Sequence, residues 1–453
     1  MPQKINNIKK YSSIPLITNI SIHNFIRLGY YGGICEVYKP HGKNIKYIDA
    51  TSMYPFVAQN PMPGNSFEYL EVPDFILNKS KGLNLDKLFG YFYCHVKSNG
   101  GYIGLLPVHL NSSLILPNGE FYGVWFSEEL KFARDNGYEI TVIKGYNFNK
   151  TYNIFDDYVT ELFNTRSTAE SPIVKTSTKL LLNSLFGRLG MSIIKPKSEV
   201  VTKENFDFLA TTRSINSILP LDKDGSYLLV NYNPVISKKV CRDSGLDFIK
   251  VLNYENKPIS DEHSKMSYVS IATAAAITLY GRIYINSIKL WIIQNGGEIY
   301  YSDTDSIVTN LMLPDNILGN KLGQFKLEYE VEEGFFLSAK TYMLKLKGGG
   351  YVIKAKGVNS DSITPEAFEK MYYSKINITA TKKTSEFSLS KGTVNISNKN
   401  IILQSESYTK RTKIIQDGLW VDTKPIDYYR NENESLNNAD NNKNINEDIN
   451  QLD

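Results

Sequence analysis

Two aspartates separated by one residue, Asp303 and Asp305, have the residue type and spacing of a catalytic or metal-binding pair. The segments on either side are rich in Tyr, Ile and Val, which predicts two short strands joined by a turn that holds both acids. In an extended chain, residues i and i+2 point to one side, about 7 Å apart. Two carboxylates within about 4 Å would repel by roughly 4 kcal/mol at an effective dielectric of 20. The pair is therefore either a solvated hairpin turn, where Asp is common, or a site with a protonated acid or a bound cation.

A third carboxylate, Asp49, ends an apolar, strand-like run and is followed by Pro55. Proline suits the first turn of a helix or a turn, so this segment is predicted to leave a strand at Asp49. A single acid at a strand end usually caps the next helix. Together with Asp303 and Asp305, Asp49 becomes a candidate third carboxylate of one site.

The most helical stretch runs from about residue 154 to residue 190 and carries a basic stripe. Four of its residues share a face by their spacing of three or four: Lys175, Lys179, Asn183 and Phe186. Leu181, Leu182 and Leu185 are predicted to form the core face. The alternative is an ordinary amphipathic helix with solvated lysines. Lysines with an aromatic ring also suit a helix that binds a nucleoside triphosphate.

Further elements surround these segments. Adjacent glycines, Gly32 and Gly33, precede a short strand and allow a close backbone approach. A long alanine-rich helix is predicted over about residues 268–294, directly before the acidic hairpin. Lysines alternate with aromatic residues over about 340–356, which suits either a surface that follows phosphates or a strand with a solvated lysine face.

Composition excludes several classes of protein. No apolar run approaches the roughly 20 residues of a membrane span, and the start of the chain carries no secretory signal. Three cysteines without a Cys-x-x-Cys pair argue against a disulfide framework or a zinc ribbon. The last 23 residues carry a net charge of −5, so residues 1–430 carry +9. A basic body is compatible with nucleic-acid binding.

The order of six short motifs resembles the family B DNA polymerases, and most closely their protein-primed branch of organellar linear plasmids and phages. Residues 301–306 match Tyr-x-Asp-Thr-Asp-Ser in full. Residues 49–55 match Asp-x-x-Ser-Leu-Tyr-Pro, with Met53 in place of Leu. The other matches are 30–33 (Tyr-x-Gly-Gly), 179–187 (Lys-x-x-x-Asn-Ser-x-Tyr-Gly, with Phe186 in place of Tyr), 278–282 (Thr-x-x-Gly-Arg) and 340–342 (Lys-x-Tyr).

The resemblance implies an α+β, right-hand polymerase fold with an antiparallel palm sheet, helical fingers and a small thumb. The expected divisions are 1–28, a remnant of an upstream region; 29–96, the first part of the palm; 97–150, a β-rich insertion at the position of terminal-protein region 1; 151–195, the fingers; 196–262, an insertion at the position of terminal-protein region 2; 263–357, the second part of the palm; 358–426, the thumb; and 427–453, a disordered acidic tail.

The resemblance also implies roles for particular residues. Asp49, Asp303 and Asp305 would be catalytic, with Asp49, Asp305 and the carbonyl of Ala50 as ligands of two Mg²⁺ ions, for which Mn²⁺ could substitute. Tyr54 would exclude a ribose 2′-hydroxyl, and Phe186 would pack on the incoming base pair. The expected nucleotide-binding residues are Ser52, Tyr54, Arg166, Lys175, Lys179, Asn183 and Phe186. The expected DNA-binding residues are Tyr30, Gly32, Gly33, Thr278, Arg282, Lys340 and Tyr342.

The implied function is that of a DNA-directed DNA polymerase, a nucleotidyltransferase that binds a DNA primer-template and dNTPs. A terminal protein that primes synthesis, a mitochondrial location and replication of a linear plasmid-like DNA follow from the same resemblance, and no membrane partner is expected. Fewer than thirty residues precede Tyr30, so we expect no proofreading exonuclease in this chain. Two alternatives remain: a polymerase that uses or makes RNA, and a catalytically inactive remnant that binds DNA.

Overall fold

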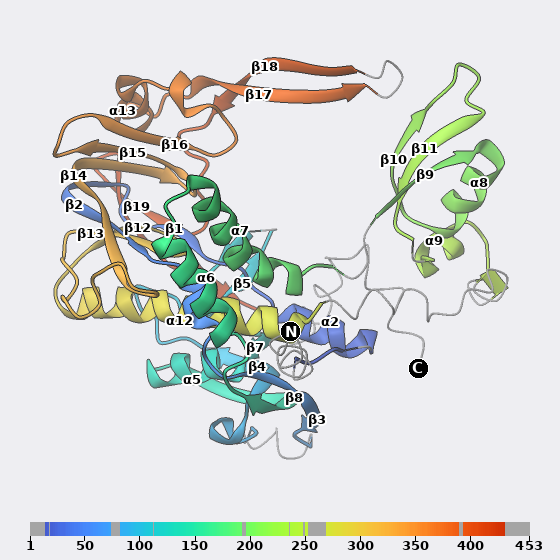
Figure 1. Cartoon of the computed structure of the whole chain (residues 1–453), viewed down its shortest axis with the longest axis horizontal. Coiled ribbons are helices and arrows are strands. Elements are labelled where there is room, and N and C mark those ends of the chain that lie inside the picture. The colour runs from blue at the N-terminus through green and yellow to red at the C-terminus, as the bar shows by residue number, and fades with distance from the viewer. Residues whose placement is uncertain are drawn as a thin grey trace.

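The computed structural model describes residues 14–430, except 18, 74–81, 112, 193–195, 235, 248–249, 252–268 and 389–392. Half of the expected remnant 1–28 and most of the expected tail lie outside the described residues. Helices and antiparallel strands alternate irregularly along the chain, which confirms the α+β class. Figure 1 shows one long helix, α12, beside a central sheet.

The central sheet carries the acidic turn. Its strand order is β1-β12-β13-β2-β14-β15-β16, and its paired strands are antiparallel. The long β2 lies between β13 and β14, so Asp49 at its end is surrounded by paired backbone. The strands are β1 (Cys35–Val37), β2 (His41–Ala50), β12 (Ile299–Asp303), β13 (Ser306–Thr309), β14 (Phe325–Ser338), β15 (Thr341–Leu346) and β16 (Tyr351–Ala355).

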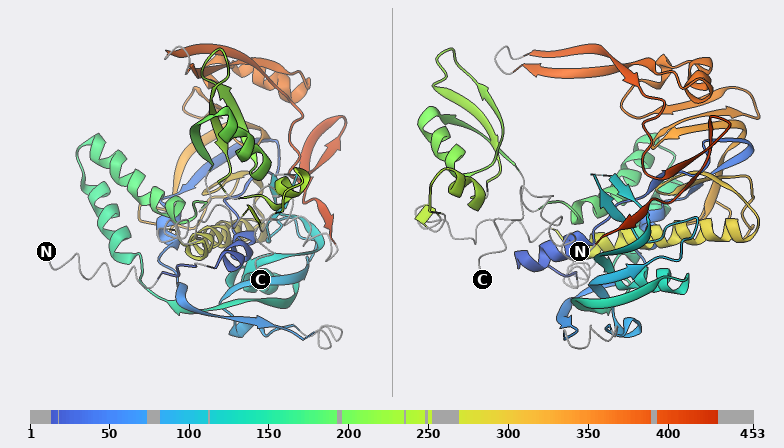
Figure 2. Two further views of the ribbon diagram at one scale, coloured as in Figure 1. Left: turned by 90° about the vertical axis from the view of Figure 1, so that its right-hand side faces the viewer. Right: turned by 180° about the vertical axis from the view of Figure 1, so that it is seen from behind.

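Helix α12 (Ile271–Gln294) lies between the central sheet and a second sheet (Figures 1 and 2). A helix that packs on two sides is apolar almost all round, which explains its alanine-rich first half and its many buried side chains. None of the helices in the described part of the chain has the length and apolar character needed to cross a membrane.

The second sheet has the order β21-β7-β4-β8-β3, with α5 (Ser127–Asp135) packed on it. Strands β3 and β4 belong to this sheet because both pair with β8, although the expected boundary at residue 97 placed them in the palm. The sequence of β3 and β4 does not show that their partner is β8, which lies later in the chain. The strands are β3 (Met62–Glu71), β4 (Gly90–Lys97), β7 (Asn118–Phe126), β8 (Glu139–Thr151) and β21 (Asp427–Tyr429).

Strand β21 corrects the expected start of the disordered tail. Residues 427–429 pair in parallel with residues 118–120 of β7, and the ring of Tyr428 lies 5.8 Å from that of Phe121. Aromatic side chains and a free sheet edge are enough to order these three residues. Residues 431–453 lie outside the described part of the chain.

The remaining elements form a helical pair, a small module and a C-terminal region. The pair is α6 (Asp156–Thr168) and α7 (Pro172–Leu189). The module has its own apolar core and consists of β9 (Lys197–Thr202), α8 (Lys203–Thr212), β10 (Ile215–Pro220), β11 (Tyr227–Tyr232) and α9 (Lys238–Asp243).

The C-terminal region contains α13 (Pro365–Tyr373), the projecting ribbon β17 (Ile378–Ser388) and β18 (Thr393–Leu403), and the hairpin β19 (Thr412–Gln416) and β20 (Leu419–Lys424) (Figure 2). Shorter elements are α2 (Ile20–Leu28), α3 (Met53–Val57), β5 (Val108–Leu110), β6 (Ser113–Ile115) and the 3-10 turns η1 (Leu85–Lys87) and η3 (Ser360–Ser362).

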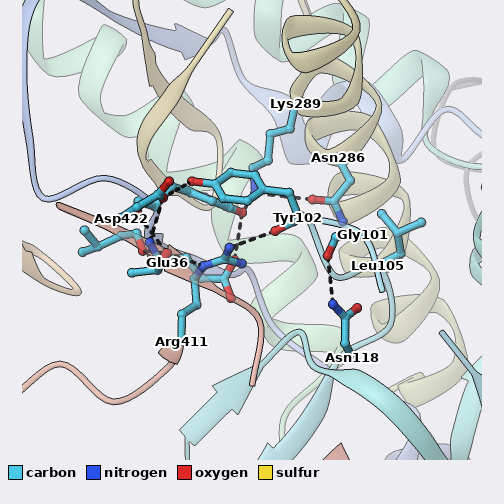
Figure 3. Close-up of polar contacts among 12 residues, drawn as sticks. Glu36, Gly101, Tyr102, Leu105, Asn118, Asn286, Lys289, Arg411 and Asp422 are labelled. Carbon is cyan, nitrogen blue, oxygen red and sulfur yellow. Dashed lines mark hydrogen bonds and ion pairs between the residues drawn. The ribbon is translucent and has the colours of Figure 1, made fainter. Parts of the chain in front are cut away.

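A buried polar cluster fastens the C-terminal hairpin to β1 and α12 (Figure 3). The Tyr38 hydroxyl donates to Glu36 Oε2 at 2.8 Å and accepts from Lys289 Nζ at 3.1 Å. The Arg411 guanidinium lies 4.4 Å from the centre of the Tyr38 ring and donates to the carbonyl oxygen of Tyr102 at 2.8 Å. Arg411 Nη1 is 3.8 Å from Glu36 Oε2, and both side chains are fully buried. Buried charges need partners, so the segments that carry Glu36, Tyr102, Lys289 and Arg411 must stay packed together.

Candidate active site

The three candidate carboxylates meet at one end of the central sheet. Asp303 is paired with Ser306 across the hairpin, and Ser306 is paired with Asp49 on β2. The Ala50 amide donates to the carbonyl oxygen of Asp305 at 2.8 Å. The expected grouping of Asp49 with the acidic pair is therefore correct, and strand register produces it.

The turn differs from the extended Asp-x-Asp geometry expected from the sequence. Thr304 has φ = 57°, in the left-handed region, and the Asp305 amide donates to the Asp303 carbonyl oxygen at 2.6 Å. A left-handed residue between the two acids ends the i, i+2 alternation, so their side chains have different surroundings.

Asp49 and Asp305 hold a concentrated negative charge. Burial, the Asp305 charge and the Glu328 charge raise the pKa of Asp49 to about 7, against the opposing charges of Lys179 and Lys326. Burial and the Asp303 charge raise the pKa of Asp305, against a backbone hydrogen bond and the charges of Lys340 and Lys179. A divalent cation between these carboxylates would relieve both effects, so the residues present fit such an ion.

This donor set is small. In the described part of the chain, no three or more His, Cys, Asp or Glu side chains form a group that could hold a metal. Hard oxygen ligands here are the Asp49 and Asp305 carboxylates and the nearby backbone, which suits a cation that also uses substrate oxygens as ligands.

Asp303 forms an ion pair with Lys340. Lys340 Nζ donates to Asp303 Oδ1 at 2.9 Å and to Oδ2 at 2.7 Å. The Lys340 amide donates to the Tyr301 hydroxyl at 3.0 Å, and Lys340 has φ = 59°. Lys340, which is also in the expected DNA-binding set, therefore binds the acidic turn through both its side chain and its backbone. Its side chain remains 57% exposed.

The loop that contains Gly32 and Gly33 packs against the acidic turn at Thr304. A Cβ atom on Gly33 would lie 2.7 Å from Thr304 side-chain atoms, so a glycine is needed for this approach. The Thr304 amide donates to the Ile34 carbonyl oxygen at 2.8 Å. Gly32 is exposed, and the Tyr30 ring packs against Gly190 at the end of α7.

The segment after Asp49 contacts both α6 and α12. Arg166 Nη1 on α6 donates to Ser52 Oγ at 3.1 Å. A Cβ atom on Gly281 would lie 3.1 Å from Tyr54 Cε1, so the glycine of the Thr-x-x-Gly-Arg motif allows α12 to lie against Tyr54. The structure thus joins the segment after Asp49 to α6 through Arg166 and to α12 through the contact of Tyr54 with Gly281.

Helix α7 confirms the basic stripe but not its aromatic end. Lys175, Lys179 and Asn183 are exposed, and the Lys179 charge acts on both Asp49 and Asp305. Phe186 is only 5% exposed, and its ring lies 6.2 Å from the ring of Phe155. In this structure Phe186 therefore packs in the core rather than on the exposed stripe, and its contact with an incoming base pair stays a prediction. Phe186 continues the buried stripe of Thr178 and Leu182 at i+4 spacing, whereas Leu181 is exposed.

Three residues expected to hold DNA have internal partners instead. Arg282 is 4% exposed and forms an ion pair with Glu129. Tyr342 is 9% exposed, and its ring packs 5.3 Å from Tyr301. The Thr278 hydroxyl donates to the carbonyl oxygen of Ala275 in its own helix at 3.0 Å. Direct binding of DNA by Arg282, or by stacking on the Tyr342 ring, is contradicted by this burial.

Glu129 is the residue at this site that sequence reasoning missed. In the sequence it follows Ser127 and Glu128 and is typical of a helix start, where acids are common. Its partner is 153 residues away, and no spacing rule connects them.

The model of the family described as DNA polymerase type B, organellar and viral, matches residues 2–275. This match covers more than half of the chain. The chain belongs to that family.

Two curated relatives extend the likeness over most of the chain. A probable DNA polymerase of Podospora anserina is 46% identical over 434 residues, 93% of this chain and 35% of the relative. A probable DNA polymerase of Neurospora intermedia is 30% identical over 426 residues, 87% of this chain and 39% of the relative. The chain thus spans little more than a third of the length of these relatives.

Among solved structures, the phi29 DNA polymerase complexed with primer-template DNA and incoming nucleotide is similar in fold. The TM-score is 0.61 at 16% identity, over 88% of this chain and 65% of that chain. The fold is therefore that of a right-hand polymerase, with the seven-stranded antiparallel sheet as its palm, which confirms the expected fold class.

Proposed function

We propose that this chain is a DNA-directed DNA polymerase that adds dNTPs to the 3′-hydroxyl of a primer on a DNA template. The observation that carries the proposal is the meeting of Asp49 and Asp305 at one end of the palm, with the Lys179 charge acting on both. Phosphoryl transfer needs little covalent chemistry from the protein, but it needs positioning and charge stabilisation. Membership of the polymerase family supports this reading.

The carboxylates of Asp49 and Asp305 and the carbonyl of Ala50 would hold two Mg²⁺ ions, with Mn²⁺ as a possible substitute. Such ions supply Lewis acidity and activate the attacking hydroxyl. The chain's own residues do the rest: Lys179 and Lys175 neutralise the triphosphate, and Arg166, held on Ser52, adds a second positive group. Asn183, exposed on the same stripe, lies within the nucleotide-binding set.

Tyr54 would exclude ribonucleotides. Tyr54 belongs to α3, and its ring packs against Gly281 of α12, which fixes the position of the ring. A fixed ring can reject a 2′-hydroxyl by occupying its space, whereas a mobile one could move aside.

The primer-template would lie along the accessible members of the DNA-binding set. Lys340 and Gly32 are exposed, and Tyr30 and Gly33 form the same loop. Arg282 and Tyr342 contribute to DNA binding through the segments that they support, and Thr278, which is half-buried, stays in the DNA-binding set.

The organellar branch of the family supports three further proposals: a terminal protein that primes synthesis, a mitochondrial location, and replication of a linear plasmid-like DNA. The regions expected to meet a terminal protein are 97–150 and 196–262. A pull-down of the purified chain with the candidate priming protein, compared with versions altered in each region, would test them.

Primer extension tests the main proposal. The wild-type chain should extend a DNA primer with dNTPs only when Mg²⁺ or Mn²⁺ is present, and Asp305→Ala or Asp49→Ala should abolish extension. Asp315→Ala, which removes an exposed acid outside the site, is the matched control. Extension that survives Asp305→Ala would overturn the assignment, and a folded wild-type chain that binds primer-template but never extends it would support an inactive remnant.

A further inference from the structure

Arg282 joins two parts of the chain that are far apart in sequence. Its Nε and Nη2 atoms donate to Glu129 Oε1 and Oε2 at 2.7 Å and 2.9 Å, a bidentate pair. Its Nη1 donates to the carbonyl oxygens of Tyr31 and Gly32, at 2.5 Å and 3.1 Å. The two charged side chains are 3% and 2% exposed. The guanidinium donates to Glu129 on one side and to the loop carbonyls on the other. These bonds fix its position and the position of the loop backbone.

The same loop backbone continues directly into contacts with the acidic turn. Gly33 packs against the Thr304 side chain, and the Ile34 carbonyl accepts the Thr304 amide at 2.8 Å. The next residue, Cys35, is paired with Asp303 in the sheet. Thr304 is the residue between Asp303 and Asp305, so a shift of this loop moves the backbone that carries both carboxylates.

A purely structural tie between the second sheet and α12 would not need this ion pair. Apolar side chains of similar volume often replace buried ion pairs without loss of stability. The carbonyl oxygens of Tyr31 and Gly32, by contrast, both accept a hydrogen bond from the same Nη1 atom of Arg282, so the place of this loop backbone depends on where Glu129 holds the guanidinium.

We propose that Glu129 is a positioning residue for the acidic turn. It orients Arg282, Arg282 holds the backbone of residues 31–32, and this backbone sets the place of Thr304 between Asp303 and Asp305. The catalytic value of this arrangement rests on the proposed polymerase function, but the contact path does not. Glu129 lies on α5, which packs on the second sheet, so this path joins the region of the second sheet to the catalytic end of the palm.

Amide hydrogen exchange tests the path without any assay of activity. In Glu129→Gln, the Thr304 amide and the segments 30–36 and 299–306 should exchange about tenfold faster than in the wild type. Glu129→Asp, which keeps the charge on a shorter side chain, should be intermediate. The control is Glu128→Gln, which alters the neighbouring acid on α5 that is paired with Lys131, and it should leave 299–306 unchanged. Faster exchange confined to α5 and α12, with 299–306 unchanged, would overturn the proposal.

A double variant covers the case in which Glu129→Gln does not fold. Glu129→Leu with Arg282→Leu removes both buried charges, so the chain should fold, but the two loop carbonyls lose their donor. Exchange at 299–306 should still be faster than in the wild type, and wild-type protection there would overturn the proposal.

Kinetics give a second readout. Glu129→Gln should raise the half-saturating Mg²⁺ concentration for extension severalfold and lower kcat, with the KM for dNTP unchanged, whereas a general loss of stability would not separate these constants. If the wild-type chain extends no primer, the proposed function fails, and the exchange result still decides the role of Glu129.

Discussion

Lys340 Nζ lies 2.9 Å and 2.7 Å from the two carboxylate oxygens of Asp303. One of the three acids at this end of the central sheet therefore already has a cation from the chain. The other two, Asp49 and Asp305, have raised pKa values because they are buried close to other negative charges. This asymmetry agrees with the proposed roles, in which Asp49 and Asp305 bind the metal ions and Asp303 does not.

Removal of the Lys340 charge should make the thermal stability of the protein more dependent on a bound metal ion. In Lys340→Met, Asp303 loses its ammonium partner beside Asp305, so the metal-free protein should melt at a lower temperature. Mg²⁺ should then raise Tm by more than in the wild type, because a bound cation offsets a larger repulsion. Lys345→Met, which breaks the 2.8 Å pair with Glu332, is the control. Equal Mg²⁺-induced shifts in Lys340→Met and the wild type would contradict the assignment.

The contact between Tyr54 and Gly281 predicts how sugar selectivity changes. Tyr54→Val should raise the use of rNTPs relative to dNTPs by about 10–100-fold, because the ring no longer fills the space of the 2′-hydroxyl. Gly281→Ala should give a smaller change, since its Cβ would lie 3.1 Å from Tyr54 Cε1 and push the ring aside. Competitive single-nucleotide insertion measures both, with Ser287→Ala on the same helix as the control. Unchanged selectivity in Tyr54→Val would remove Tyr54 from this role.

The buried pair of Arg411 and Glu36 should contribute strongly to stability. Arg411→Met leaves the Glu36 carboxylate buried without its guanidinium partner, at a cost of roughly 3–5 kcal/mol in the free energy of unfolding. Glu36→Gln in the same chain should recover part of this loss, because the neutral amide carries no charge. Urea unfolding measures each step, with the exposed Arg242→Met as the control. A double variant less stable than Arg411→Met alone would show that the charge is not the cause.

Lys289 should give the protein a distinct pH dependence. Burial lowers the pKa of its ammonium group to about 8, the Glu36 charge opposes this shift, and the Arg411 charge adds to it. The Tyr38 hydroxyl and the Asn286 side-chain oxygen are its hydrogen-bond partners. Between about pH 8 and the ordinary pKa of 10.5, the unfolded chain binds a proton that the folded protein has released, so this group's contribution to stability rises with pH.

Lys289→Met removes that titration. Relative to the wild type, it should be more stable at pH 7, where the folded wild type carries a buried charge, and should lose this advantage towards pH 10. Thermal unfolding across this range measures the difference, with the exposed Lys382→Met as the control. A difference that does not change with pH would exclude Lys289 as its source.

The parts of the site that the sequence predicts correctly depend on local pattern. Asp49 lies at the end of β2, and Asp303 and Asp305 lie at the turn between β12 and β13. Because β2 runs antiparallel to β13, its end meets the start of β13 at this turn. The exposed stripe of Lys175, Lys179 and Asn183 follows from helical spacing alone. Family membership follows from the order of the motifs.

The tertiary structure decides which side of each element is covered, and by what. Helical spacing places Phe186 next to the basic stripe, but Phe155 covers it and makes it part of the core. Strand propensity does not show that residues 427–429 find a free sheet edge at residues 118–120. Arg282 matches a DNA-binding motif, yet its guanidinium is used by Glu129 and by the loop at Tyr31. The last two contacts join segments more than 150 residues apart, and Phe155 precedes a different helix from the one that carries Phe186. Local periodicity carries no information about such packing between elements.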